Sequence, residues 1–152
     1  MISYTALGQL GGVAAMAISA VGSGMGAGIA GQAAVGAWKR CFIQNKPAPF
    51  QLAVFVGAPL SQTIYGMILM LLISNKAKAV DPSNWLFLLL AGIIGGCGMA
   101  VSAYMQGKAA AGCCDAFAET GKGFTNNLLV LGVIETVALF VMVFVIIALA
   151  AI

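Results

Sequence analysis

The sequence contains few charged residues and no histidine. Only 7% of its 152 residues are charged, whereas 62% are hydrophobic and the mean hydropathy is +1.06. Soluble domains of this size do not have such a composition, and long apolar runs at this density indicate transmembrane segments rather than one large core. The formal net charge of +3 is too small to indicate a nucleic-acid partner.

Several functional motifs are also missing. The four cysteines, Cys41, Cys97, Cys113 and Cys114, show no metal-ligand spacing, so we expect structural or incidental roles for them. No Gly-rich phosphate loop followed by Lys-Ser/Thr is present, and the chain is not expected to bind nucleotide or an organic cofactor. The first positive charge is Lys39. The N-terminus therefore lacks the charged region of a signal peptide and is expected to begin a membrane helix.

Four apolar runs are each long enough to cross the roughly 30 Å hydrocarbon core of a bilayer as a helix. They extend over about residues 7–37, 50–74, 85–111 and 124–152. Pro47 and Pro49 in the first loop are expected to stop a helix, and residues 75–83 form a polar, turn-forming segment that ends in an N-cap-like Ser83-Asn84. The sequence therefore predicts an all-α membrane protein with four transmembrane helices.

The two halves of the chain are similar to each other. Residues 22–36 align with residues 98–112 at several Gly and Ala positions, and Gln62 aligns with Glu135. Two duplicated hairpins are the simplest explanation. The expected parts are a first hairpin over 1–74 without a carboxylate, an external loop over 75–83, and a second hairpin over 84–152 that carries the carboxylate.

The first and third helices are rich in small residues. The spacing Gly22/Gly26 and Gly92/Gly96 allows helix backbones to approach closely in lipid. Such glycine-rich helices are expected mainly where neighbours press on several sides, as in a ring of several copies.

Positive charge is distributed unevenly over the loops. Loops one and three, counted with Lys108, hold five Lys and Arg residues, whereas the middle loop holds two. The positive-inside rule then predicts that loops 38–49 and 112–123 are cytoplasmic and that both termini lie outside. We expect a multi-pass protein of the cell (plasma) membrane. Asp115 and Glu119 are expected to be solvated loop charges.

One charged residue, Glu135, interrupts the last apolar run. Every other residue from Phe124 to Ile152 is uncharged. An ionised carboxylate near the middle of a membrane helix costs several kcal/mol unless it is paired, coordinated or protonated. Glu135 is therefore the leading candidate for a functional group.

The second helix offers polar groups at the same depth. Ala58, Ser61, Gln62 and Tyr65 are spaced i, i+3, i+4 and i+7, so they share one helical face. Pro59 cannot donate a backbone hydrogen bond and tends to kink a helix, which can tilt the Ala58 carbonyl out of its ladder. This face presents a carbonyl, a hydroxyl, an amide and a phenol.

Gln106 on the third helix adds a second amide. One carboxylate surrounded by neutral oxygens fits a monovalent hard cation, Na⁺ in particular, because a divalent ion normally receives more carboxylates. A proton needs only one acceptor near the carboxyl and stays an alternative. The same polar groups could also simply hydrogen-bond between helices, at about 0.6 kcal/mol each.

These residues resemble the membrane-rotor proteolipid (K or c) subunit of bacterial V-type and V/A-type rotary ATPases. The segment 59–66, Pro-Leu-Ser-Gln-Thr-Ile-Tyr-Gly, is similar to the family's Pro-x-Thr-Gln-x-x-Tyr-Gly. Residues 106–108 are similar to its Gln-Gly-Lys, and residues 135–136 to its Glu-Thr, the pattern of the sodium-translocating branch. The resemblance covers essentially the whole chain. It departs at Ser61, where threonine is common.

The resemblance implies a set of ion ligands and a mechanism. The implied Na⁺ ligands are the Ala58 backbone oxygen, Ser61, Gln62, Gln106 and Glu135, with Tyr65 hydrogen-bonded to the carboxylate. It further implies a homo-oligomeric ring, with the first and third helices inside and the other two outside. A stator subunit would supply a membrane arginine, and a central-stalk subunit would contact the cytoplasmic loops. The chain itself would be a non-catalytic subunit.

Two other classes stay as alternatives. A small multidrug transporter also has four helices and one membrane glutamate, but that glutamate lies in its first helix. A structural or channel-forming proteolipid would explain the small-residue packing and leave Glu135 unused. Within the rotary class, a proton-coupled rotor is the main alternative.

Overall fold

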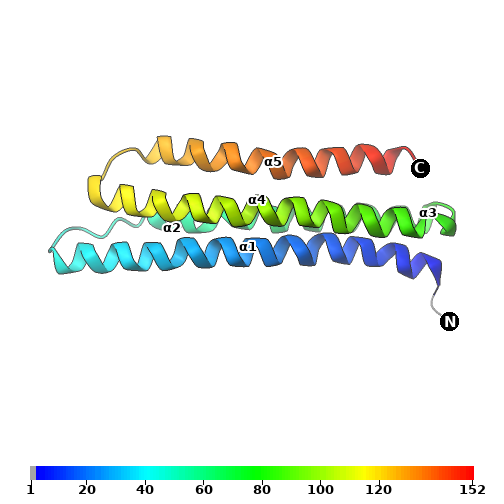
Figure 1. Cartoon of the computed structure of the whole chain (residues 1–152), viewed down its shortest axis with the longest axis horizontal. Coiled ribbons are helices and arrows are strands. Elements are labelled where there is room, and N and C mark those ends of the chain that lie inside the picture. The colour runs from blue at the N-terminus through cyan, green and yellow to red at the C-terminus, as the bar shows by residue number, and fades with distance from the viewer. Residues whose placement is uncertain (1–2) are drawn as a thin grey trace.

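The computed structural model describes residues 3–152, and the described part of the chain is helical throughout except for short connections (Figure 1). Residues 1 and 2, with which the expected first hairpin begins, lie outside the described residues. The elements are α1 (Tyr4–Ile43), α2 (Leu52–Gly57), the 3₁₀ turn η1 (Ala58–Leu60), α3 (Ser61–Ala79), the 3₁₀ turn η2 (Pro82–Asn84), α4 (Trp85–Thr120) and α5 (Phe124–Ala150).

Within residues 3–152, four helical segments are long and apolar enough to cross a membrane. They are Tyr4–Ile43, Leu52–Ala79, Pro82–Thr120 and Phe124–Ala150. Figure 1 shows them side by side, with the two chain ends at one end of the bundle and the α1–α2 and α4–α5 connections at the other. The expected all-α fold of four long apolar helices is confirmed.

The helices are longer and the connections shorter than expected. The loop expected over 38–49 begins only after Ile43, and the loop expected over 112–123 shrinks to three residues after Thr120. The helix before the middle connection also continues to Ala79. The polar residues in these segments do not prevent helix formation, so the helices extend through parts of the expected loops. The α4 helix ends only where Gly121 adopts a left-handed conformation with φ 64°, which glycine accepts without a steric penalty.

Glycines bring α1 and α4 into backbone contact. A Cβ at Gly92 would lie 1.8 Å from the Gly11 carbonyl oxygen, and a Cβ at Gly107 would lie 2.2 Å from the Gly26 Cα. A side chain at either position would force the helices apart. The small-residue spacing therefore works as expected, by letting two helices pack without side chains between them.

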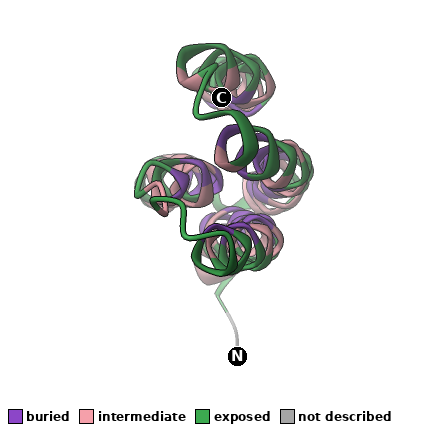
Figure 2. Ribbon diagram, turned by 90° about the vertical axis from the view of Figure 1, so that its left-hand side faces the viewer, coloured by how far each residue is buried: buried purple, intermediate pink, exposed green. Residues whose placement is uncertain are grey.

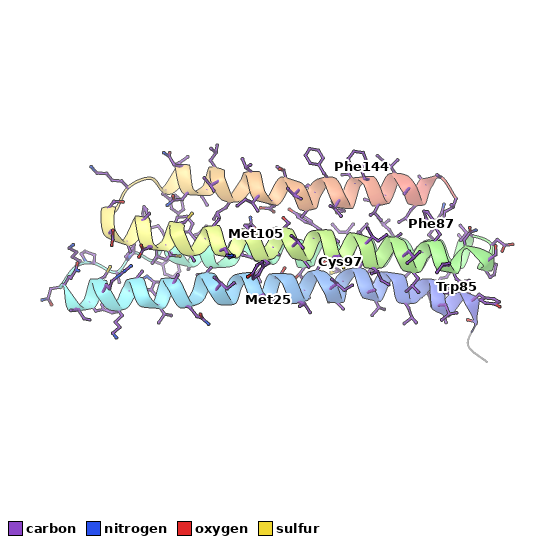
Figure 3. The ribbon with its side chains drawn as sticks, in the orientation of Figure 1. Met25, Trp85, Phe87, Cys97, Met105 and Phe144 are labelled. Carbon is purple, nitrogen blue, oxygen red and sulfur yellow. The ribbon has the colours of Figure 1, made fainter. Side chains whose placement is uncertain are left out.

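The fourth long helix is much less covered than the others. Only 11% of the most apolar window of α5 is buried, compared with 39% of that of the Pro82–Thr120 segment. Figure 2 shows the buried residues on the surfaces where helices meet, and much of α5 exposed. Phe144, labelled in Figure 3, lies on α5 and is 65% exposed. The single chain thus presents a large apolar surface along α5.

Two apolar clusters occupy the two ends of the bundle. One contains Phe55 and Phe117, whose rings meet edge to face at a centroid distance of 6.0 Å. The other contains Leu69, Met99 and Ala138. The buried polar side chains lie along the helices between these clusters, which places them near the middle of the bundle.

Candidate functional site

The second membrane segment is interrupted at Pro59. The α-helix stops at Gly57, a single 3₁₀ turn covers Ala58–Leu60, and the helix resumes at Ser61. Pro59 itself is buried. The proline thus coincides with a change from α-helical to 3₁₀ geometry. Because proline has no N–H and clashes with the preceding turn, the carbonyls around it need other partners.

Ser61 provides one of those partners. Its Oγ donates to the Ala58 carbonyl oxygen at 3.1 Å and also lies 3.2 Å from Gln62 Oε1. The Ala58 carbonyl also accepts the Ser61 backbone N–H, so the hydroxyl is its second donor and connects the 3₁₀ turn to the first amide of the site.

Two glutamines cross the centre of the bundle. Gln62 on α3 and Gln106 on α4 are both fully buried, and Gln62 Nε2 donates to Gln106 Oε1 at 2.8 Å. Gln62 Nε2 also lies 3.5 Å from Ser102 Oγ. A buried amide without partners would cost roughly 1–3 kcal/mol, so this pairing is part of what allows two amides at this depth.

Glu135 closes the network from α5. Tyr65 donates its hydroxyl to Glu135 Oε1 at 2.5 Å, and Gln106 Nε2 donates to Glu135 Oε2 at 3.3 Å. The same Gln106 nitrogen donates to the Leu131 carbonyl oxygen at 2.9 Å. Each carboxylate oxygen thus has a donor. The short phenol contact is typical of a charge-assisted hydrogen bond.

All six sequence-predicted residues belong to this one network. It runs from the Ala58 carbonyl through Ser61, Gln62 and Gln106 to Glu135, with Tyr65 bound at the far carboxylate oxygen. Three helical segments, η1–α3, α4 and α5, contribute to it. Glu135 is partly exposed on α5, whereas the two glutamines are enclosed. The site is therefore closed on the inner side of the bundle and accessible at its carboxylate.

The sequence analysis missed Ser102. Its Oγ donates to the Ile134 carbonyl oxygen at 3.0 Å and so connects α4 to the turn of α5 that carries Glu135. Ser102 precedes Gln106 by four residues, which puts both on one face of α4. That spacing is the signal that could have identified it. Thr136 stays outside the network, because its hydroxyl donates to the Val133 carbonyl oxygen on its own helix.

The charged residues near the α4–α5 connection form a separate group. Asp115 lies on α4 rather than in a loop, and it forms an ion pair with Arg40 of α1. This corrects the expectation that Asp115 and Glu119 lie in a loop: both are on α4, and both are exposed. The two side chains are 49% and 54% exposed, for Arg40 and Asp115 respectively. An exposed pair of this kind contributes little to stability.

Comparison with known proteins finds a family and a distant relative. Residues 89–148 match the sequence model of the ATP synthase C subunit family. The chain is also 33% identical over 144 residues to the A-type ATP synthase subunit K of Methanocaldococcus jannaschii. That alignment covers 92% of this chain and 60% of the archaeal protein, so the chain spans about three-fifths of its relative's length. Neither description names a coupling ion.

Proposed function

We propose that this chain is an ion-translocating rotor subunit of a V-type or V/A-type ATP synthase or ATPase. Its similarity over residues 89–148 to the ATP synthase C subunit family, and over 144 residues to an archaeal subunit K, supports this proposal. Subunits of this family are non-catalytic membrane subunits, in agreement with the expectation that this chain is not an enzyme. The nucleotide chemistry would take place on other subunits of the complex.

The observation that carries the proposal is the set of partners around Glu135. A carboxylate in the middle of a 27-residue apolar helix is expensive, yet it has one phenol and one amide donor arranged on its two oxygens. Packing alone does not require a charged group there. A group that is loaded with a cation, neutralised and then released does require one.

Na⁺ is the ion that the surrounding oxygens fit best. The Ala58 carbonyl, the Ser61 hydroxyl and the amide oxygens of Gln62 and Gln106 belong to the same hydrogen-bond network as Glu135. Four neutral oxygens and one negative charge suit a dehydrated monovalent hard cation. In the proposed ion-loaded state, Gln106 Oε1 turns from Gln62 Nε2 toward the ion.

A proton is the second candidate. The 2.5 Å distance between Tyr65 and Glu135 is equally suitable for a protonated carboxyl that donates to the phenol oxygen. In that case the remaining oxygens would serve only to hold the helices together. The two candidates differ in one property, whether Na⁺ competes with protons at Glu135.

In the proposed mechanism, several copies form a ring in which α1 and α4 lie inside and α3 and α5 outside. The exposed apolar surface of α5 supports an outer position, against lipid or a stator. An arginine of the stator would compete for the Glu135 carboxylate and release the ion into a half-channel. Ion flow along a potential of about 100 mV supplies about 2.3 kcal/mol per charge, which rotation transmits to the soluble part of the complex.

The proposed topology places the α1–α2 and α4–α5 connections in the cytoplasm of a plasma membrane, with both chain ends outside. Lys39, Arg40 and Lys46 lie at or beside that end of the bundle and are all exposed. They would contact the central stalk. Cysteine introduced at Lys46, which should react with an impermeant thiol reagent only from the cytoplasmic side, tests this orientation in a background from which Cys97 has been removed.

Carbodiimide labelling of Glu135 in the purified assembly tests the function. Carbodiimides react with a protonated carboxyl, so a bound cation blocks them. We expect Na⁺ to slow labelling at constant pH, K⁺ to have no effect, and Glu135→Gln to abolish labelling. Glu119→Gln is the matched control, because Glu119 is an exposed carboxylate on α4 that should not contribute to protected labelling.

Other outcomes would select other functions. Labelling that follows pH alone would make the rotor proton-coupled. Failure of Glu135 to label at all would contradict the rotor function itself. A non-rotary transporter or a structural proteolipid would in addition fail to purify as a large SDS-resistant ring together with ATPase subunits.

A further inference from the structure

Ser23 on α1 is a buried hydroxyl that the network described above does not use. It is 1% exposed, and in the described part of the chain its Oγ has no hydrogen-bond partner. One turn earlier, Ser19 is equally buried but donates to the Ala15 carbonyl oxygen at 2.7 Å. A buried hydroxyl without a partner costs about 1–3 kcal/mol. A group that supplies a partner in another state of the protein would explain its presence.

Contacts on either side establish what Ser23 faces. A Cβ at Gly66 would lie 2.7 Å from Ser19 Oγ, so Ser19 is in contact with Gly66 on α3. A Cβ at Gly26 would lie 2.3 Å from the Ala103 carbonyl oxygen of α4 and 3.0 Å from the Pro59 side chain, so α1 packs here against both α4 and the second segment. Ser23 follows Ser19 by four residues and precedes Gly26 by three, which puts all three on one face of α1.

Gln62 occupies the matching position on the second segment. It follows Pro59 by three residues and precedes Gly66 by four, so these three residues share the face that packs against α1. Because α1 and this segment run in opposite directions (Figure 1), Ser23 lies at the level of Gln62. The unpartnered hydroxyl therefore lies at the level of the residue whose amide is hydrogen-bonded to Gln106 and Ser102, and no hydrogen bond joins Ser23 to Gln62 in the structure.

Ion binding would change which hydrogen-bond acceptor is available to the Gln62 amide. In the structure, Gln62 Nε2 donates to Gln106 Oε1 at 2.8 Å. If Gln106 Oε1 turns to Na⁺, that N–H loses its acceptor, and only the longer contact to Ser102 remains. A buried N–H without an acceptor would oppose ion binding. A hydroxyl on the α1 side can accept it.

We propose that Ser23 is a positioning residue of the ion site, whose Oγ accepts a hydrogen bond from Gln62 Nε2 when Gln106 Oε1 turns to bind Na⁺. This inference rests on the proposed function. It adds α1, which contributes no ligand, to the elements that determine ion affinity. Ser23 acts through Gln62 and does not itself bind the ion.

The test compares two buried serines on the same face of one helix. Ser23→Ala and Ser19→Ala are assembled into rings, and the Na⁺ concentration that halves carbodiimide labelling of Glu135 is measured for each. We expect an increase of about tenfold for Ser23→Ala, corresponding to one lost hydrogen bond, and less than about twofold for Ser19→Ala. The labelling rate without Na⁺ should be the same in both variants and in the wild type.

Three results would overturn the inference. Equal half-protecting Na⁺ concentrations for the two variants would show that Ser23 has no specific part in ion binding. A change of the Na⁺-free labelling rate in Ser23→Ala would indicate a purely structural effect. A wild type that Na⁺ does not protect would overturn both the inference and the sodium function, whereas a protected wild type with unchanged Ser23→Ala overturns the inference alone.

A second variant keeps the test decisive if Ser23→Ala fails to assemble. Ser23→Cys is close to serine in size, but its sulfur is a weak acceptor. We expect the same increase in the half-protecting Na⁺ concentration. An unchanged value in Ser23→Cys would contradict the inference.

Discussion

The two hairpins place different groups at aligned positions. Gln62 in the first hairpin is fully buried beside α1, whereas Glu135 in the second lies partly exposed on α5, the least covered helix. Both belong to one hydrogen-bond network through Gln106. The two aligned positions are therefore not equivalent. One half supplies neutral oxygens in an enclosed position, and the other supplies the charge at an accessible position.

Removing the charge should have the largest effect. Glu135→Gln makes the two aligned positions identical, and we expect loss of carbodiimide labelling and of ion-coupled transport, with the ring still assembled. The reason is that no other carboxylate lies in the network to bind a cation. Na⁺-dependent transport by reconstituted complex is the measurement, with ring assembly on a native gel as the control.

Exchanging the two groups sharpens the same comparison. The double variant Gln62→Glu/Glu135→Gln keeps the number of carboxylates but moves the charge to the enclosed position. We expect that transport is not restored, because position 62 faces α1 and not the exposed surface of α5. Recovery of transport would mean that a carboxylate at the buried position 62 supports ion transport as well as one at the partly exposed position 135.

Disrupting the contact between α1 and α4 should have the next largest effect. Gly92→Ala places a Cβ 1.8 Å from the Gly11 carbonyl oxygen, so α1 and α4 must separate. We expect a loss of about 3 kcal/mol in stability, at the upper end of the usual cost of overpacking. Thermal unfolding in detergent measures it. Gly132→Ala is the matched control on α5, because nothing lies within 4 Å of a Cβ there, and it should be tolerated.

Removing one donor to the carboxylate should have a smaller effect. Tyr65→Phe deletes the 2.5 Å hydrogen bond to Glu135, and hydrogen bonds to charged groups are worth about 1.5–3 kcal/mol. We expect the half-protecting Na⁺ concentration to increase at least about tenfold. Tyr104→Phe serves as the control, since Tyr104 lies on α4 outside the network and its ring is in contact with Lys108. An increase of the same size in the control would contradict a specific role for the Tyr65 hydroxyl.

The connection between α3 and α4, which contains Asp81, should contribute least to stability. Asp81 accepts from the Ser83 backbone N–H at 2.8 Å, and hydrogen bonds from the Ser83 side chain and backbone hold the pKa of its carboxyl below the ordinary value of 3.8. Because the folded-state pKa is the lower one, the stabilisation is complete above pH 3.8 and is lost as the pH falls below it. We expect the melting temperature to decrease slightly when the pH is lowered from above 3.8 to below the folded-state pKa of Asp81. Asp81→Asn should abolish it, and an unchanged pH dependence in that variant would exclude Asp81 as its source.

The sequence allowed much of the candidate site to be predicted. The i, i+3, i+4, i+7 spacing placed Ala58, Ser61, Gln62 and Tyr65 on one face, and the isolated charge identified Glu135. The structure brings these residues into one hydrogen-bond network, and the sequence could indicate them because helical periodicity and the cost of a charge in lipid are local properties. Ser102 and Ser23 were not found, because serine is common in membrane helices and only contact with other helices distinguishes these two.

Helix ends were predicted less well than helix positions. The expected loops over 38–49 and 112–123 were too long, since hydropathy marks where a segment leaves the apolar region and not where its backbone stops being helical. The actual end of α4 depends on the left-handed conformation of Gly121, and the helical residues before it include the Asp115 that pairs with Arg40.

The four apolar helices, the similarity between residues 22–36 and 98–112, and the position of the single membrane carboxylate can be read from the amino-acid sequence alone. Composition, period and repeat are properties of the chain alone. The tertiary structure decided that α1 and α4 meet through their glycine backbones, that Gln62 pairs with Gln106, and that Tyr65 and Gln106 each take one oxygen of Glu135. These features depend on the relative rotation and depth of separate helices, which side-chain packing establishes and local sequence pattern does not specify.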